Sequence, residues 1–408
     1  MPSSSTCAAV PGVGFSAAAA AGDLLAALRA VPDPRPGGAR RHPTAFVLGV
    51  LVMSFASAGF ESFTAAAQWA AAADRSLLLA LGATPDPLTA TVRAPSEATL
   101  RRVACGVDRE ALEAVAAAWT AGQIHGPAPE TPRLAVAIDG KTVRGARAAG
   151  QVAPHLLAAC THATPELAPV VLGQRQIPDK TNEIPMVAVL IEDLRAAGHD
   201  PAGMVFTADA LHTQHRTAEL FHTAGAGYAL TVKGNQPGLR TAIRDQINAQ
   251  RPPRSSARGR GNGRTEQRLI EVVPATGITF PGATQVFRIT RYAGGLDGQR
   301  QRKEVVHGIT NLTAGEADPE RLAALVRGHW AIENSVHWVR DVTYREDAHR
   351  ARTGNAPAVL ACIRNLVTTA LRLAGALNIA AARRAATLKP KTILRLLRRP
   401  PKPDKSSM

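Results

Sequence analysis

The chain has 408 residues, which is too long for one small domain and suits two or three. Lysine and arginine total 48 against 32 acidic residues, and the formal charge of +16 indicates a polyanionic partner, either nucleic acid or an anionic membrane surface. The four cysteines are scattered, which excludes a CxxC metal or redox motif and makes a disulfide framework a poor explanation for so long a chain.

The N-terminal quarter of the chain is predicted to be helical. Residues 1–22 contain proline, serine and alanine without a clear period and without the basic region of a signal peptide, so we expect them to be disordered. Apolar runs separated by proline and glycine then predict an all-α domain over 23–126. The uncharged stretch 44–60 could be a buried helix or a membrane span. Its serines and glycines favour the buried helix, so we expect no membrane association.

After a proline-rich boundary at 125–133 the pattern changes to alternating strands and helices. Short apolar runs predict strands at 134–139, 155–162, 168–177, 203–209 and 228–234, and longer periodic runs predict helices at 182–198, 213–225 and 238–250. This alternation predicts an α/β catalytic domain over 133–350 with a mixed sheet. The same rules identify Ser96 as the N-cap of a helix in the preceding domain.

The alternation is interrupted between residues 251 and 313. Residues 251–268 contain six arginines and one acid and are interpreted as an arginine- and glycine-rich loop. Runs at 268–273, 284–294 and 304–312 predict strands without helices between them, so we interpret 251–313 as a β insertion. Helices resume at 318, and residues 351–408 are predicted to form C-terminal helices and a basic tail.

Two predicted strands end in an aspartate. Asp139 closes the strand LAVAID and Asp209 closes GMVFTAD. Acids at the carboxyl ends of neighbouring strands can converge on one cation, and their oxygen ligands suit Mg²⁺ or Mn²⁺. An aspartate in a turn is the alternative reading for Asp139. Basic residues that suit phosphate contacts follow it, namely Lys141, Arg144 and Arg147.

Two further segments carry polar residues that fit such a site. The segment YALTVKGNQPGL ends a strand with Lys233, Asn235 and Gln236, which would suit either a DNA backbone or a turn. If 327–347 is one α-helix, its spacing places His329, Glu333, His337 and Arg340 near one face, flanked by Trp330 and Trp338.

Three carboxylates are what DNA cleavage and joining require. The reaction needs an activated hydroxyl and a stabilised leaving oxygen, and two metal ions about 4 Å apart supply both. Asp139, Asp209 and Glu333 are therefore the candidate catalytic and metal-binding residues. A zinc site at His329, Glu333 and His337 is an alternative, but the HExxH spacing is absent and no cysteine supports zinc.

Five motifs in order carry a resemblance to a known family. IDGKTVRGAR, KTNEIP, FTADALHTQ, YALTVKGNQP and RGHWAIENSVHWVRDVTYRED resemble the transposases of the ISAs1 insertion-sequence family, which belongs to the IS4-like DDE group and includes H-repeat-associated proteins. The resemblance extends over residues 23–375 and implies an RNase H-like fold with a β insertion before the last catalytic helix. It also implies that Asp139, Asp209 and Glu333 are the first, second and third acids.

The resemblance leaves some positions open. The wider group carries an arginine and a lysine around the last acid, where this chain has His329 and Arg340, and Asp341, Glu346 or Asp347 could assist or replace Glu333. The predicted DNA-contacting side chains are Lys141, Arg144, Arg147, His212, Lys233, Asn235, Gln236, Arg327, His329, Trp330, Asn334, His337 and Arg340.

We therefore expect a DDE transposase that cuts DNA at insertion-sequence ends and transfers the strands into target DNA, with two Mg²⁺ or Mn²⁺ ions. Its partners would be the double-stranded terminal inverted repeats, bound by the helical N-terminal domain, and the target DNA. Two ends must be held together, so we expect a homodimer on DNA, in the cytoplasm at the nucleoid. The alternative functions are a catalytically inactive DNA-binding protein derived from a transposase and a zinc-dependent hydrolase.

Overall fold

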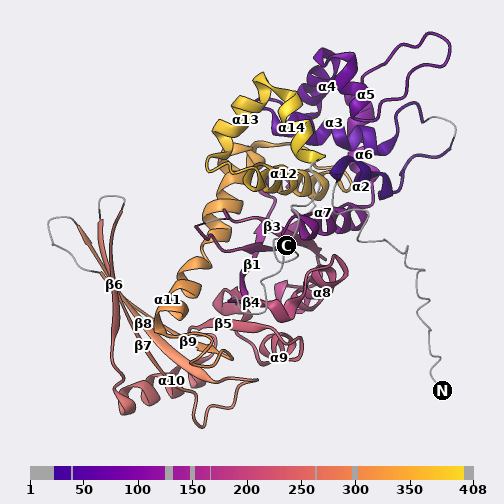
Figure 1. Cartoon of the computed structure of the whole chain (residues 1–408). Helices are drawn as coiled ribbons and strands as arrows, with labels where there is room; N and C mark the ends of the chain where they lie inside the picture. The colour runs from indigo at the N-terminus through magenta and orange to yellow at the C-terminus, as the bar shows by residue number, and fades with distance from the viewer. Residues whose placement is uncertain are drawn as a thin grey trace, which may run out of the picture.

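The computed structural model describes residues 23–37, 40–124, 132–147, 152–165, 167–261, 264–295 and 302–398. The predicted disordered N-terminus, most of the proline-rich boundary and the end of the basic tail lie outside these residues. Within them the chain forms a helical body and a large mixed sheet that lie next to each other (Figure 1).

Helices fill the first described region, as the sequence predicts. They are α2 (Leu24–Ala27), η1 (Leu28–Ala30), α3 (Thr44–Ala56), α4 (Phe63–Ala72), α5 (Arg75–Ala80), α6 (Glu97–Gly106) and α7 (Arg109–Gln123). All residues of α3 except Ala45 are buried, so the uncharged stretch is a core helix. The predicted cap of α6 is confirmed, because the Ser96 hydroxyl accepts a hydrogen bond from the Thr99 amide at 3.3 Å.

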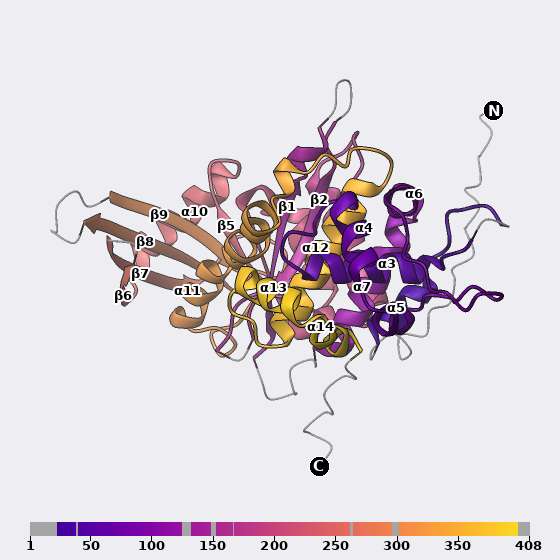
Figure 2. The same ribbon diagram turned by 90° about the horizontal axis from the view of Figure 1, so that it is seen from above.

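The C-terminal helices belong to the same body. They are α12 (Ala356–Leu373), α13 (Ile379–Leu388) and α14 (Pro390–Leu397), and they lie beside α3 in both views (Figures 1 and 2). Val359 and Ile363 of α12 share one core with Phe46 and Phe55 of α3. The described parts of the predicted segments 23–126 and 351–408 therefore pack as one unit, although they are far apart in sequence. Among the described residues, α12 is long and apolar enough to cross a membrane, but 94% of it is buried inside the protein.

One mixed sheet runs through the rest of the described chain, in the order β3-β2-β1-β4-β5-β9-β8-β7-β6. β1, β4 and β5 are parallel, and the other neighbours are antiparallel. The strands are β1 (Leu134–Thr142), β2 (His155–Thr161), β3 (Val171–Ile177), β4 (Met204–Ala208), β5 (Gly227–Val232), β6 (Ser255–Gly261), β7 (Arg264–Pro274), β8 (Gln285–Gly295) and β9 (Arg302–Thr310).

The four strands β6–β9 form an arm that extends away from the helical body (Figures 1 and 2). The predicted strands of the β insertion are confirmed, but the prediction of a loop at 251–268 is wrong. Ser255–Gly261 pairs with β7 in a regular antiparallel register, from Ser255↔Ile270 to Gly261↔Arg264. β6 is an exposed edge strand whose pairing rests on backbone hydrogen bonds, so it lacks the apolar alternation by which strands are found in sequence.

Helices cover both faces of the sheet. On one face, called here the α8 face, lie α8 (Glu183–Ala196), α9 (His215–Thr223) and α10 (Pro237–Gln250), whose apolar side chains pack on residues such as Ile138 and Leu230. The opposite face, called the α11 face, is covered by α11 (Pro319–Gly328) and by the segment after it. Leu322 and Leu325 of α11 pack there on Phe287 and Ile289.

The segment that follows α11 is not the single α-helix that the sequence predicts. It continues as two π-helical stretches, η5 (Ile332–His337) and η6 (Val339–Thr343). A π-helix turns more slowly than an α-helix, so side chains drift around the axis relative to the α spacing. Ile332 and Val336 anchor the segment on Ala137 and Cys160 of the α11 face.

Candidate active site

Two aspartates lie side by side where the parallel pairing of β1 and β4 ends. Asp209 follows the last residue of β4, whereas Asp139 lies inside β1, which continues to Thr142 and does not end at residue 139 as the sequence predicts. β1 and β4 pair in the register Ile138↔Ala208, so Asp139 and Asp209 are the next residues of the two strands. Side chains alternate along a strand, and Ala137 packs on the α11 face, so Asp139 points to that same face. The Asp209 carboxylate accepts a hydrogen bond from the Ala210 amide at 2.8 Å.

The third predicted acid comes from the segment that lies over these strands. Glu333 is exposed and follows Ile332, which is buried against β1 and β2. Burial raises the pKa of Asp139 to about 7. The negative charges of Glu183, Glu333 and Asp209 also raise this pKa, whereas a hydrogen bond from the Gly140 amide lowers it. The carboxylates are therefore near enough to one another for each to oppose ionisation of Asp139.

A stripe of side chains four residues apart, at the end of α11 and along the π-helical segment, faces the edge of the sheet. Its members are His329, Glu333, His337 and Asp341. The Nδ1 atom of His329 lies 3.3 Å from the Thr207 hydroxyl, and that of His337 lies 3.5 Å from an Asp139 carboxylate oxygen. Burial lowers the pKa of His329 to about 4 and that of His337 to about 3. Both rings are therefore neutral at pH 7 and can exchange hydrogen bonds without adding charge.

The stripe ends with Asp341 and not with Arg340. Asp341 accepts a hydrogen bond from the Lys141 ammonium at 2.7 Å, whereas the Arg340 guanidinium is 1% exposed and lies 2.7 Å from Glu346. The expectation that Arg340 is presented to DNA is therefore not met in this structure, because the π-helical turn directs it inward. Glu346 is fully buried between Arg340 and Arg364, which leaves it no role beside Glu333.

Lys233 extends the acidic site on the next strand. Its ammonium lies 3.5 Å from the Asp209 carboxylate, and both side chains are more than half exposed. The amides that follow it hold a turn, since Asn235 donates to the Ala210 carbonyl at 2.7 Å and Gln236 donates to the Thr213 carbonyl at 3.1 Å. Of the two readings of this loop, the structure favours the turn for Asn235 and Gln236.

Several predicted DNA-contacting residues are accessible around the acids. The tryptophans are not packing residues, because Trp330 is 56% and Trp338 is 55% exposed. The other exposed members of the predicted set are Arg144, Arg147, Lys233, Asn235, Arg327 and Asn334, although the Asn235 amide is used in the turn. His212, in contrast, is completely buried, so neither a surface role nor a DNA contact fits it in this structure.

A second polar network lies below the acids, and the sequence did not assign a role to its central residue. Glu183 accepts hydrogen bonds from His155 at 2.7 Å and from His212 at 3.0 Å, and His155 also bonds to the Thr142 hydroxyl at 2.8 Å. Burial opposes ionisation of Glu183, but the two histidines outweigh it and lower its pKa to about 2. A side chain at Gly140 would collide with Glu183 and His155, which explains the glycine after Asp139.

Glu183 occurs in the KTNEIP motif, directly after the Asn182 cap of α8. An acid at the first position of a capped helix is common for reasons of helix stability alone, so the sequence offered no signal for its contact with two distant histidines.

The donor set of the edge suits a hard divalent cation. Asp139, Asp209 and Glu333 offer carboxylate oxygens, and no basic side chain among the described residues lies against Asp139 except the neutral ring of His337. In the described part of the chain no three acidic, histidine or cysteine side chains are already gathered as a metal site. The exposed side chains of Asp209 and Glu333 would therefore rotate toward Asp139 to share an ion.

Comparisons with known proteins give one consistent result. The family model described as "Transposase DDE domain" matches residues 130–369, and that described as "DDE_Tnp_1-associated" matches residues 25–120. YncI of Escherichia coli O157:H7, which is named as a transposase, is 30% identical over 290 residues, or 68% of this chain and 71% of YncI. The H repeat-associated protein YhhI of E. coli K12, also named as a transposase, is 28% identical over 58% of this chain and 63% of YhhI.

Among solved structures, a piggyBac transposase synaptic complex with hairpin DNA aligns over 86% of this chain and 72% of that one. Its TM-score is 0.38 at 11% sequence identity.

Proposed function

The chain belongs to the family of proteins that carry the DDE domain of transposases, and we propose on this basis that it cuts DNA at the ends of an insertion sequence and transfers the strands into target DNA. The observation that carries the proposal is the placement of Asp139 and Asp209 side by side, directly after the last parallel pair of β1 and β4, with Glu333 contributing charge from the segment above. Within the family we assign the chain to the ISAs1 branch of the IS4-like group, and its catalytic domain, residues 133–350 with the β insertion, to the RNase H-like fold.

Asp139, Asp209 and Glu333 would hold two divalent cations, Mg²⁺ or Mn²⁺. When bound, such a pair activates an oxygen nucleophile and neutralises the leaving oxygen of a phosphodiester. His337 holds the Asp139 carboxylate in place from the buried side, 3.5 Å away. Thr207 and His162, bonded at 2.8 Å, fix the neutral His329 ring beside Asp209.

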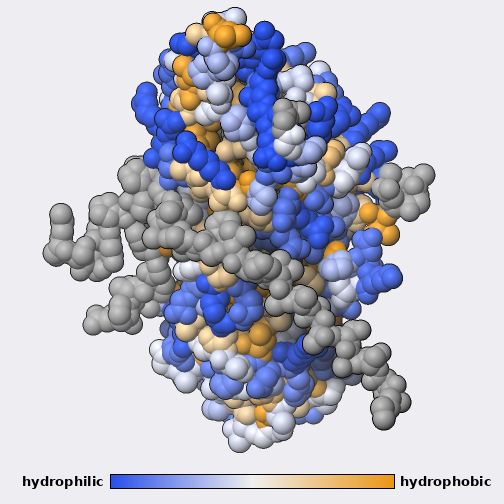
Figure 3. Space-filling model, turned by 90° about the vertical axis from the view of Figure 1, so that its right-hand side faces the viewer, coloured by the Kyte–Doolittle hydropathy of each residue, from blue (hydrophilic) through white to orange (hydrophobic). Residues whose placement is uncertain are grey.

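The DNA would contact the exposed residues around this edge. Arg144, Arg147, Arg327 and Lys233 supply charge for phosphates, and the exposed Trp330 and Asn334 lie next to Glu333 on its segment. Lys141 is held by Asp341 and would reach a phosphate only by leaving it. The helical N-terminal domain, 23–126, would bind the terminal inverted repeats, and hydrophilic residues cover much of the visible surface of the helical body (Figure 3). Two chains would hold two ends as a homodimer, in the cytoplasm at the nucleoid.

The test is Mg²⁺-dependent cleavage of a plasmid that carries the DNA flanking this gene, where short inverted repeats are expected. We expect the wild-type chain to cut at those repeats and Asp139→Ala, Asp209→Ala and Glu333→Ala to bind the same DNA without cutting it. Glu219→Ala, an exposed acid on α9 that belongs to none of the predicted sites, is the matched control and should cut normally. Normal cleavage by Asp139→Ala would refute the assignment, and a wild-type chain that binds without cutting would favour a non-catalytic DNA-binding protein.

A further inference from the structure

The α8 face of the arm carries its side chains in regular rows. In the pairing of β7, β8 and β9, Glu271 lies beside Arg288 and His307, and Gln267 lies beside Tyr292 and Lys303. Arg258 of β6 extends the second of these rows. Since residues two apart along a strand share a face, all of them lie on the side where Ile243 and Ile247 of α10 pack against the row of Val273, Val286 and Ile309.

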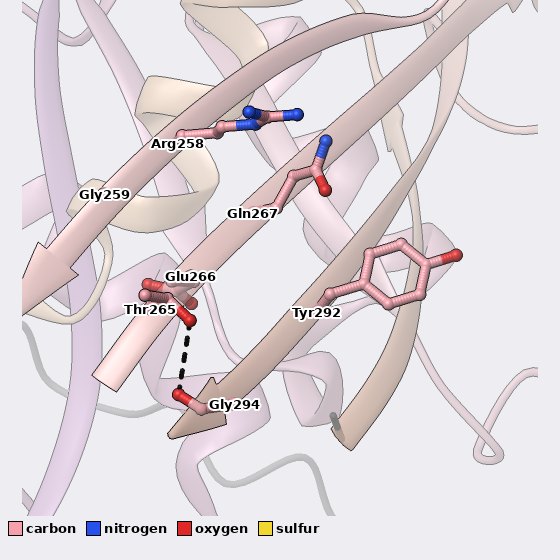
Figure 4. A pocket seen from close by; sticks show the side chains of 7 residues that line it. All are labelled: Arg258, Gly259, Thr265, Glu266, Gln267, Tyr292 and Gly294. Atoms are coloured by element: carbon pink, nitrogen blue, oxygen red, sulfur yellow. Dashed lines mark hydrogen bonds between the residues drawn. The ribbon is translucent and has the colours of Figure 1, made fainter. Parts of the chain in front are cut away.

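Two adjoining hollows occupy this face beyond the edge of α10. The larger has a volume of about 590 Å³, and the smaller, next to α10, about 350 Å³. Tyr292 lines both, so the hollows form one continuous groove across the arm. Figure 4 shows Arg258, Gln267 and Tyr292 extending from three neighbouring strands toward the same side.

The groove is positively charged. Its lining includes five basic residues, Arg244, Arg254, Arg258, Arg288 and Lys303. The buried acid Glu271 is shared by Arg254 at 3.1 Å and Arg288 at 2.7 Å, and Asp245 neutralises Arg244 at 2.8 Å. Among the described residues neither Arg258 nor Lys303 has a carboxylate partner, and the Lys303 ammonium lies 6.0 Å from the ring centre of Tyr292.

The opposite side of the same strands is charge-balanced. There Glu266 pairs with Arg268 at 2.9 Å and with Arg291, and Arg291 also lies 3.6 Å from Glu304. Two acids thus neutralise two arginines on that side, and Glu266, which also lines the groove at its rim, is already occupied by them. Apart from the exposed Arg302 at the start of β9, the unpaired positive charge described on the arm therefore lies in the groove.

A buried histidine at the α10 end of the groove lacks a partner. His307 is 4% exposed, lines the smaller hollow, and within the described structure neither ring nitrogen has a hydrogen-bond partner. Burial lowers its pKa to about 4, and the cations that face it, Arg240, Arg288 and Arg244, act in the same direction. A neutral imidazole still carries one N–H donor, and a buried donor in a folded protein is normally paired. The arrangement is that of a site whose acceptor comes from a ligand.

We infer that this groove binds the phosphodiester backbone of DNA at a place separate from the catalytic acids. The inference rests on the proposed function, since a transposase handles DNA beyond the phosphate that it cuts. Arg258 and Lys303 stand three strand spacings apart, roughly 14 Å, which is wide enough to contact more than one phosphate of a DNA strand. The acids point to the α11 face and the groove lies on the α8 face, so the two sites contact different parts of the DNA.

The test compares two neighbouring lysine and arginine positions on β9. Lys303→Glu reverses a charge in the groove, whereas Arg302→Glu makes the same reversal one residue earlier, on the opposite face of the strand. Both residues are exposed, so both variants should fold, as far-UV circular dichroism and thermal melting will check. Binding to a fluorescent 30-bp duplex without insertion-sequence ends is measured by anisotropy over a range of salt concentrations, in EDTA.

We expect Lys303→Glu to weaken binding of the duplex at least tenfold and to make the slope of log affinity against log salt shallower by about one, and adding Arg258→Glu to weaken it further. Arg302→Glu should change the affinity less than threefold. The same measurement on a single-stranded 30-mer distinguishes two modes of recognition. An equal loss of affinity for both DNAs indicates recognition of one strand's backbone, and a loss for the duplex alone indicates recognition of the duplex. Equal effects of the groove variant and the control would overturn the inference.

This outcome is separable from that of the proposed function. The anisotropy measurement needs no catalysis, so a chain that fails to cut but shows the groove effect would refute only the proposed cleavage. A chain that cuts DNA with the groove variant binding as tightly as wild type would refute only the inference.

Discussion

Two groups of charged side chains lie thirteen residues apart on one segment, around Glu333 and around Glu346. They differ in how far their negative charges are neutralised by neighbouring cations. Around Glu333 the carboxylate of Asp139 has no charged basic partner among the described residues, and Asp209 has only the exposed Lys233. Burial together with repulsion from the neighbouring acids raises the pKa of Asp139. Around Glu346 two guanidiniums lie within 3.0 Å of one carboxylate. Burial alone would raise the pKa of Glu346, yet Arg340 and Arg364 hold it below the ordinary value.

The difference separates a structural charge from a functional one. The buried group of Arg340, Glu346 and Arg364 satisfies most of its charge internally, and Arg364 also lies 5.4 Å from the ring centre of Phe55, so the group joins the segment to the helical body. The acids around Glu333 leave negative charge that a bound cation from outside the chain would neutralise. Stability should therefore depend on the first group and activity on the second.

Removing the buried carboxylate should have the largest effect on stability. Glu346→Ala leaves Arg340 and Arg364 buried without a counter-charge, and we expect a loss of about 3–5 kcal/mol in the free energy of unfolding, measured by urea denaturation. The exposed neighbour Asp347→Ala should cost less than about 0.5 kcal/mol. Equal losses in the two variants would remove the distinction drawn between the two groups.

A triple variant sharpens the same comparison. Replacing Arg340 and Arg364 by methionine and Glu346 by leucine removes the charges together and leaves an apolar cluster of similar volume. We expect it to recover most of the stability that Glu346→Ala loses, because no buried charge remains uncompensated. A triple variant as unstable as Glu346→Ala would show that the ion pairs contribute specific geometry that apolar packing does not replace.

Glu113 is an intermediate case, a buried acid with one amide partner. Its carboxylate accepts a hydrogen bond from Gln174 at 2.9 Å, and burial raises its pKa to about 8. The folded chain therefore keeps a proton that the unfolded chain loses near pH 4.5. The contribution of Glu113 to the free energy of unfolding should fall by up to about 1.4 kcal/mol per pH unit as pH rises from 4.5 to 8.

Glu113→Gln should remove this pH dependence and make the protein more stable than wild type at pH 8. Urea denaturation at pH 5 and pH 8 measures both effects. Glu219→Gln, on the exposed side of α9, is the control and should leave the wild-type pH dependence in place. A difference in stability between wild type and Glu113→Gln that is the same at pH 5 and pH 8 would contradict the assignment of a protonated Glu113.

Much of this arrangement could be predicted from the sequence. Buried parallel strands are short apolar runs, so the strands β1 and β4, with Asp139 and Asp209 beside each other, follow from composition and order alone, although β1 runs to Thr142 and does not end at Asp139. The N-cap at Ser96 and the buried helix α3 were equally local signals. What the sequence could not provide depends on contacts or on backbone geometry without a residue signature.

Three examples show the limit. Arg340 was assigned to the DNA-facing stripe because an α period was assumed, and the π-helical stretch turned it inward. β6 was interpreted as a loop because an exposed edge strand has no apolar pattern. Glu183 received no role because its partners, His155 and His212, are 28 and 29 residues away in opposite directions along the chain.

The smallest predicted effect concerns the catalytic acids themselves. If Asp139 is held among like charges, Asp139→Asn should stabilise the metal-free protein by about 0.5–2 kcal/mol at pH 8 while it abolishes cleavage. The asparagine has the same shape and removes one of the opposing charges, so stability and activity should change in opposite directions. Urea denaturation in EDTA measures the gain, and Asp347→Asn, where no such crowding exists, should show none. A loss of stability in Asp139→Asn would mean that the aspartate is compensated after all, and the contrast between the two groups would then lie only in their exposure.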